Sequence, residues 1–144
     1  MYTYLIDSLC GGKIFNISRV CNLISIDIHT KGNEEIHLHI QTFFRIVKKN
    51  KVVLSSEDIY RCGRNCNKNE FEWDVPGQSV FDESLLENKS VICNSTIQKV
   101  EKEKNGDLTI CLNNDICLQA FIDTTKKEEK YRIFSLKEDI IVES

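Results

Sequence analysis

The 144-residue chain has no apolar stretch long enough to cross a membrane, because charged residues recur every few positions. Residues Met1 to Asp7 lack the basic and uninterrupted apolar segments of a secretion signal. No basic block stands out, and the net charge is −3. These absences predict a cytoplasmic protein that binds no membrane. They also argue against direct binding of nucleic acid, which depends on neutralising phosphates.

Motifs of several enzyme classes are missing as well. The chain has no nucleophile elbow, no phosphate-binding glycine loop and no HExxH helix. Gly11-Gly12-Lys13 lacks the rest of a phosphate-binding loop and is typical of a turn that enters a strand. The sequence therefore predicts a protein that is not an enzyme and needs no cofactor.

Cysteine is plentiful, with seven residues, but the number is odd and no secretion signal accompanies it. Reduced thiols are the natural prediction for such a chain. Cys62-x3-Cys66 is the one close pair that suggests zinc, and structural zinc sites usually add a second close pair, which this sequence lacks. We therefore predict a loop with free thiols and no metal.

Apolar and polar residues alternate in several short segments. A period of two places the apolar side chains on one face, which is typical of half-buried antiparallel strands. Clusters of Asn, Gly and Asp between these segments are typical of hairpin turns. The predicted core residues, all apolar members of alternating segments, are Ile26, Leu38, Ile40, Leu108, Ile110 and Leu118.

A single helix is predicted near residues 79–88, where Ser79 can cap the start and Phe81 and Leu85 form an apolar stripe. The expected fold class is therefore mainly β (α+β). We expect residues 1–144 to form a single domain, and the oligomeric state is left open. 

Two parts of the chain, at about residues 9–60 and 85–136, resemble each other loosely. This favours two repeated four-strand meanders in one antiparallel sheet or a partly open barrel. Chance similarity between two meanders is the alternative. The matched segments are 9–13 with 85–89, 22–26 with 107–110, 36–40 with 116–120, and 44–46 with 131–133.

Three histidines offer a competing hypothesis. If the strand near 22–29 pairs with the strand near 35–41, one register places His29 opposite His37, and Asp27 opposite His39. Two histidines at i and i+2 plus a third on the next strand is a geometry that zinc enzymes use. This hypothesis makes the chain a metal-binding or enzymatic domain. The simpler interpretation is a solvent-facing polar strand surface without metal.

The irregular segment 62–79 joins the two similar parts and contains Phe71-Glu72-Trp73-Asp74. One interpretation is an edge strand with Phe71 and Trp73 in the core. The other is an acidic binding surface with an aromatic anchor, because tryptophan is enriched at binding hot spots. The predicted partner-binding residues, which are acidic or aromatic, are Glu57, Asp58, Glu70, Glu72, Trp73 and Asp74.

Six segments carry a family resemblance: Leu9-x3-Lys13, Leu38-His39-Ile40, Phe44-Arg45-Ile46, Ser55-Ser56-Glu57-Asp58, Gly106-Asp107-Leu108 and Tyr131-Arg132-Ile133-Phe134. In these segments the chain resembles the small bacterial immunity proteins of contact-dependent inhibition and related polymorphic toxin systems. The resemblance covers about residues 9–60 and 85–134 and rests on structural spacings, not on catalytic signatures. It implies a non-enzymatic cytosolic inhibitor of one cognate toxin domain, often a nuclease with a basic active site. A generic protein-interaction module is the further alternative.

Overall fold

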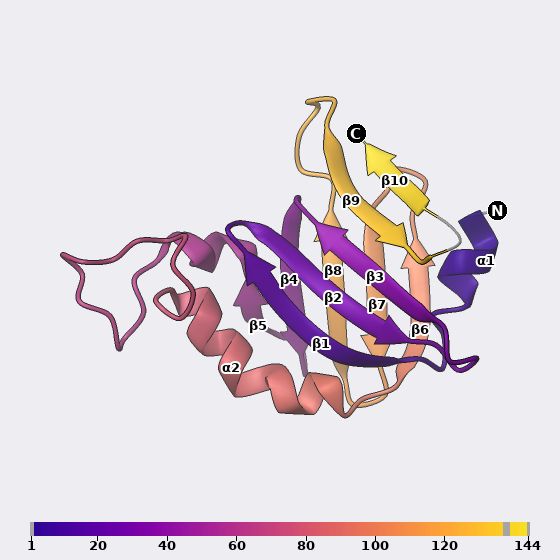
Figure 1. Ribbon diagram of the computed structural model, residues 1–144, viewed down its shortest axis with the longest axis horizontal. Helices are drawn as coiled ribbons and strands as arrows, with labels where there is room; N and C mark the ends of the chain where they lie inside the picture. Colours follow the sequence, from indigo (N-terminus) through magenta and orange to yellow (C-terminus); the bar gives the residue numbers. More distant parts are fainter. Residues whose placement is uncertain (1, 137–138, 144) are drawn as a thin grey trace.

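A computed structural model describes residues 2–136 and 139–143 and shows two five-stranded antiparallel sheets packed face to face (Figure 1). One sheet has the strand order β1-β2-β3-β9-β10 and the other has the order β5-β4-β8-β7-β6. The mainly β class is confirmed. The strands of the first sheet are β1 (Lys13–Val20), β2 (Leu23–His29), β3 (Glu35–Ile40), β9 (Glu129–Phe134) and β10 (Asp139–Glu143). Those of the second are β4 (Phe43–Lys48), β5 (Lys51–Ser55), β6 (Ile97–Lys102), β7 (Leu108–Leu112) and β8 (Ile116–Phe121).

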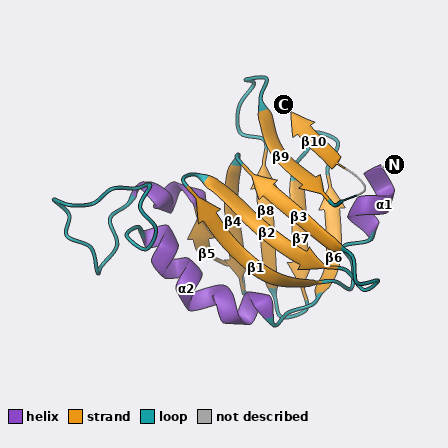
Figure 2. Cartoon of the chain, in the orientation of Figure 1, coloured by secondary structure: helices purple, strands orange, loops and turns teal. Residues whose placement is uncertain are grey.

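The helices lie at the flanks of the two sheets. The longer helix, α2 (Val80–Cys93), runs past β1 and β5, and the short helix α1 (Tyr2–Asp7) lies at the other flank (Figures 1 and 2). A 3-10 helix, η1 (Ser56–Tyr60), follows β5. The predicted start of the long helix is confirmed, since Ser79 and Asp82 form a reciprocal cap. The helix continues past residue 88 because Ile92 extends the buried stripe.

Each half of the chain contributes one helix followed by five strands. The first half places β1, β2 and β3 in one sheet and then β4 and β5 in the other, and the second half makes the reverse exchange. Consequently β3 pairs with β9, and β4 pairs with β8. The predicted similarity aligns β3 with β8 and β4 with β9, which are the elements in equivalent places. Each half has five strands where four were expected, and the internal repeat itself stays a prediction.

The division into two sheets, in place of one sheet or a partly open barrel, arises at the β3–β4 connection. Alternation runs unbroken through it, because Ile40, Thr42 and Phe44 are all buried. The chain bends at this point, and the Thr42 hydroxyl, with its single proton, lies within hydrogen-bonding distance of both the Phe121 carbonyl and the Asp123 carboxylate. A strand that bends from one sheet to the other keeps its inner face inside. The alternation of buried and exposed residues therefore cannot reveal where the chain passes from one sheet to the other.

The inner faces of both sheets share one hydrophobic core. The six predicted core residues are confirmed as buried, with exposed fractions from 0% to 2%. Phe81, Leu85 and Ile92 of α2 join the same cluster. The helix thus seals the β1–β5 flank with apolar side chains.

The prediction that all seven cysteines are free is wrong for one pair. Cys111 and Cys117 lie directly opposite each other on β7 and β8 and form a disulfide, with their Cα atoms 4.1 Å apart. The reason is the hairpin register, which a three-residue turn at 113–115 fixes. The pair lies on the outer face of its sheet, because the neighbouring Ile110, Leu112 and Ile116 point inward.

Candidate functional site

The irregular segment predicted between the two halves is a projecting loop, residues 61–79, which leaves the body of the molecule between η1 and α2 (Figures 1 and 2). Its two ends are tied together by backbone hydrogen bonds. The Gly63 N–H donates to the Gln78 carbonyl at 2.8 Å, and the Val80 N–H donates to the Arg61 carbonyl at 2.9 Å. The loop is therefore closed at its base and not an open tether.

A buried ion pair anchors the loop to the first sheet. Arg19 of β1 donates two hydrogen bonds to the Asp82 carboxylate, both at 2.7 Å, and only 3% of the Arg19 side chain is exposed. The same carboxylate accepts hydrogen bonds from the Gly77 and Ser79 N–H groups. Burial alone would raise the pKa of Asp82, but the hydrogen bonds from Arg19 and Ser79 outweigh it and lower the pKa below its usual value. Asp82 is therefore ionised at neutral pH.

A second carboxylate, that of Glu83, binds the segment of the loop that follows Gly63. Glu83 accepts hydrogen bonds from the Arg64 N–H at 2.6 Å and from the Asn65 N–H at 3.3 Å. Gly63 is required beside it, because a Cβ atom there would lie 2.7 Å from the Gln78 carbonyl oxygen and 2.8 Å from the Glu83 carboxylate. Two successive acids of α2 thus fix both halves of the loop.

The anchored loop presents an aromatic pair. The rings of Tyr60 and Trp73 have centroids 5.2 Å apart, and the two residues are 51% and 37% exposed. They line a surface concavity of about 420 Å³ together with Phe71, Glu72 and Asp74. Such pairs stabilise each other, so the Trp73 ring is held in place before any partner arrives.

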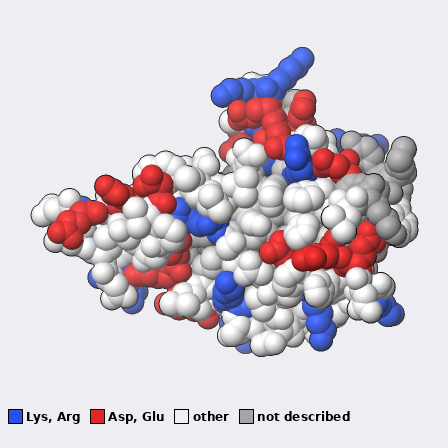
Figure 3. All heavy atoms as spheres, viewed as in Figure 1, with Lys and Arg blue, Asp and Glu red and all other residues white. Residues whose placement is uncertain are grey.

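The six predicted partner-binding residues are only partly brought together. Glu72, Trp73 and Asp74 share the concavity, and Glu57 lines a neighbouring one that also includes Tyr60. Asp58 is engaged by Arg61, at 2.8 Å. Glu70 lies exposed elsewhere on the loop. Figure 3 shows acidic side chains gathered over this projection.

Sequence reasoning missed Tyr60. Neither periodicity nor composition marks it, and its role depends on η1 turning its ring toward the loop. The alternative of an edge strand with Phe71 and Trp73 in the core is wrong. Residues 71–74 form a loop and a turn, and Trp73 is exposed.

The histidine hypothesis used the wrong register. β2 and β3 pair with Asp27 opposite His37, and with His29 opposite Glu35. The turn decides this, because the Thr30 N–H donates to the Glu34 carbonyl and leaves a three-residue connection with Asn33 at φ 63°. The expected register needed a turn two residues longer.

With this register the rings of His37 and His39 both pack against Phe134, the His39 ring edge-on, whereas the His29 ring packs at a tilt against Phe15. His37 Nδ1 also lies 2.6 Å from Asp27 Oδ1. Within residues 2–136 and 139–143, no group of three or more His, Cys, Asp or Glu side chains is arranged to hold a metal ion.

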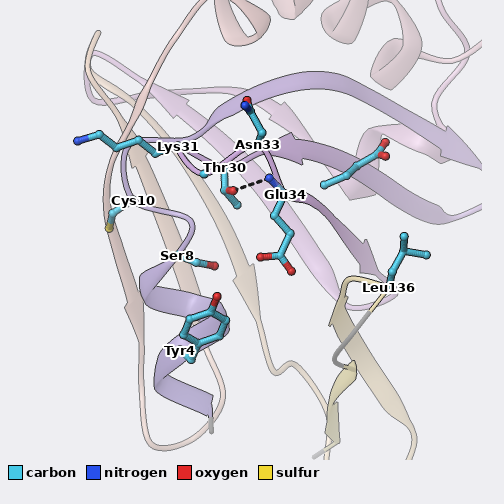
Figure 4. A pocket seen from close by; sticks show the side chains of 10 residues that line it. Tyr4, Ser8, Cys10, Thr30, Lys31, Asn33, Glu34 and Leu136 are labelled. Atoms are coloured by element: carbon cyan, nitrogen blue, oxygen red, sulfur yellow. Dashed lines mark hydrogen bonds between the residues drawn. The ribbon is translucent and has the colours of Figure 1, made fainter.

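A larger concavity, of about 780 Å³, lies at the opposite end of the molecule beside α1 (Figure 4). Tyr4 of α1 and Ser8, which follows this helix, face the β2–β3 turn across the concavity. A hydrogen bond from the Glu34 N–H to the Thr30 hydroxyl stiffens that turn. Tyr4 is 62% exposed and Leu136 is fully exposed, so the hollow has open walls. Among its described lining residues Thr30 is the one buried polar residue, and its hydroxyl already accepts from the Glu34 N–H, whereas a small-molecule site usually has several convergent buried polar groups.

Comparison with known proteins adds no relative, since no family model, curated protein or solved structure matches this chain. In the part of the chain that the structure describes, no helix has the length and apolar character needed to cross a membrane. The interpretation of the site therefore depends on its own geometry.

Proposed function

We propose that this protein acts by binding and not by catalysis, and that the projecting loop docks on a basic protein partner. The observation that carries the proposal is the exposed Tyr60–Trp73 pair on an anchored loop, with Glu72 and Asp74 beside it. Large aromatic side chains supply much of the energy of protein interfaces, particularly when they are held in place before binding.

The surrounding charge supports a partner of opposite sign. Glu57, Glu70, Glu72 and Asp74 are all exposed on or beside the loop. Complementary charge speeds encounter and sets the orientation of docking. A nuclease must attract phosphate and therefore carries positive potential around its active site.

These features support, as a proposal, the role of an immunity protein. In this role the chain binds a cognate toxin domain, of nuclease type, in the cytoplasm and covers its basic active site. In this complex the loop enters the toxin's active site with its acidic and aromatic side chains. Inhibition then requires stoichiometric binding and no turnover.

The test begins with co-purification of the intact chain from its native host and identification of the bound protein. The association rate is then measured at low and high salt for the wild type and for Glu70→Lys/Glu72→Lys/Asp74→Lys. A matched control is Asp7→Lys/Glu103→Lys/Glu143→Lys, which alters two exposed Glu and one exposed Asp outside the loop. Both triple variants shift the net charge from −3 to +3.

We expect the loop variant to associate roughly ten or more times more slowly at low salt, where screening is weak, and the control to change far less. Folding of both variants is checked by circular dichroism. Equal rates for the two folded variants would refute the loop as the interface. Turnover of a substrate by the purified chain would refute the binding role.

A further inference from the structure

The projecting loop contains two neighbouring thiols at its base. Cys62 and Cys66 flank a turn in which the Cys66 N–H donates to the Gly63 carbonyl. The Cys62 thiol lies 3.4 Å from the Cys66 carbonyl oxygen, and the neighbouring Cys62 side chain raises the pKa of the Cys66 thiol. Both cysteines are half-exposed, so small reagents can reach them.

The second thiol is connected to the aromatic concavity through one side chain. The Cys66 thiol lies 3.5 Å from Gln78 Oε1 and 3.6 Å from the Asn67 carbonyl oxygen, and the Glu72 N–H donates to Gln78 Oε1 at 3.0 Å. Trp73 follows Glu72 directly. Gln78 therefore holds the Cys66 side of the loop and the Trp73 side together.

We propose that Cys62 and Cys66 are a reversible disulfide-forming site that reacts with small-molecule disulfides, and that its oxidation loosens the segment bearing Trp73. Closing the bond draws the Cys66 sulfur toward Cys62 and removes the S–H donor from Gln78. The Glu72–Gln78 hydrogen bond then loses the neighbour that fixes its acceptor. The regulatory consequence, weaker partner binding after oxidation, rests on the proposed function.

The chemistry is a two-step thiol–disulfide exchange. The Cys62 thiolate attacks one sulfur of the small disulfide, an S–S bond forms, and one small thiolate leaves and takes up the Cys62 proton. Cys66 then loses its proton and attacks the Cys62 sulfur, which releases the second small thiolate. That thiolate takes up the Cys66 proton. The chain gives up two electrons and two protons, and the small disulfide is reduced to two thiols.

The surroundings of the pair favour this order. Partial burial, the adjacent Cys62 and the nearby carboxylates of Glu70 and Glu83 raise the pKa of the Cys66 thiol. A thiol with a raised pKa contributes little thiolate at neutral pH, and the proposal therefore gives Cys66 the second, resolving step.

The experiment uses the full chain with Cys10, Cys21 and Cys93 changed to Ser, so that Cys62 and Cys66 are the free thiols that remain. The chain is incubated with glutathione disulfide, alkylated and mapped by mass spectrometry. We expect a Cys62–Cys66 bond with no retained glutathione. Adding Cys66→Ser should instead trap glutathione on Cys62. A pair that stays reduced, or a stable glutathione adduct on the unsubstituted pair, would overturn the proposal.

The conformational part is read from tryptophan fluorescence, because Trp73 is the only tryptophan. Oxidation should raise the acrylamide quenching constant on the order of twofold, as expected for a loosened loop. Gln78→Ala, kept reduced, should raise it in the same direction. An unchanged constant in the oxidised chain would refute the link from the thiols to Trp73.

Partner affinity separates this inference from the proposed function. If oxidation changes quenching and weakens binding of the identified partner several-fold, both the redox inference and the proposed function stand. If oxidation changes quenching but not the affinity for the partner, and the triple lysine variant of the loop also binds normally, the redox site stands and the loop is not the interface. If the reversal variants weaken binding but oxidation does not, the proposed function stands and the regulatory claim fails.

Discussion

Arg19 and Asp82, which are 63 positions apart, meet in a two-point ion pair with both hydrogen bonds at 2.7 Å. The pair joins β1 to the first turn of α2. The Arg19 guanidinium also donates to the Cys21 carbonyl at 2.8 Å and faces the Val75 carbonyl of the loop. One buried cation thus connects the sheet, the helix and the projecting loop.

Breaking this pair should be costly. Asp82→Asn leaves the Arg19 charge buried without a counter-charge, so we expect a loss of about 3–5 kcal/mol in the free energy of unfolding. Asp58→Asn is the control, because it removes an ion pair whose arginine side chain is 68% exposed. The control should lose less than about 1 kcal/mol. Urea unfolding measures both, and equal losses would contradict the structure.

Acid should weaken the same link. The folded pKa of Asp82 is lowered, so its contribution to stability is complete above the ordinary aspartate pKa of about 4 and is lost as the pH falls through the lower folded value. Urea midpoints measured from pH 6 to pH 2 should therefore fall more steeply for the wild type than for Asp82→Asn. Parallel curves would show that Asp82 titrates alike in the folded and unfolded states.

Truncating the loop tryptophan should spare the fold. Trp73 is 37% exposed, whereas Phe81 of α2 is fully buried. We expect Trp73→Ala to lower the unfolding free energy by less than about 1 kcal/mol, and Phe81→Ala to lower it by about 3–5 kcal/mol. Thermal melting followed by circular dichroism compares them. A large loss in Trp73→Ala would mean that Trp73 belongs to the core.

The shared core should respond to a single truncation in β3. Leu38 is 1% exposed and faces the opposite sheet, so Leu38→Ala should cost about 2–5 kcal/mol. Val52→Ala on β5 is the surface control, since Val52 is 53% exposed. Its cost should stay near or below about 0.5 kcal/mol. Chemical denaturation of both variants checks the assigned register.

The β7–β8 disulfide should be detectable by counting thiols. Unfolded without reductant, the chain should show five reactive thiols out of seven cysteines. Cys111→Ser/Cys117→Ser should lose about 2 kcal/mol, because the short cross-linked segment no longer restricts the unfolded chain. Seven reactive thiols in the purified wild type would show that the pair stays reduced under those conditions.

Much of the fold could be predicted from local pattern. Alternation identified the inner faces of β2, β3, β7 and β8, and Ser79 with Asp82 marked the start of α2. α1 was not predicted, because six residues give too little periodicity to recognise a helix. The register of β2 against β3 was missed by two residues, since alternation fixes only which face is buried and a shift of two preserves it.

The candidate site shows the same division. The acidic and aromatic composition of residues 57–74 was visible in the sequence, but the contacts that make it a surface are not local. Tyr60 meets Trp73, and Arg19 holds Asp82, across separations that no short pattern records.

The sequence by itself determined which faces of β2, β3, β7 and β8 are buried, where most turns lie and where α2 begins, because these depend on neighbours a few residues apart. Only the tertiary structure decided that the chain crosses between two sheets at Thr42, that Cys111 bonds Cys117, and that the loop is anchored through Asp82 and Glu83. A bend from one sheet to the other does not interrupt the alternation of buried and exposed residues. A buried ion pair between distant residues follows from packing alone. The physical reason is that pairing between sheets and across loops depends on three-dimensional proximity, which the order of residues does not encode locally.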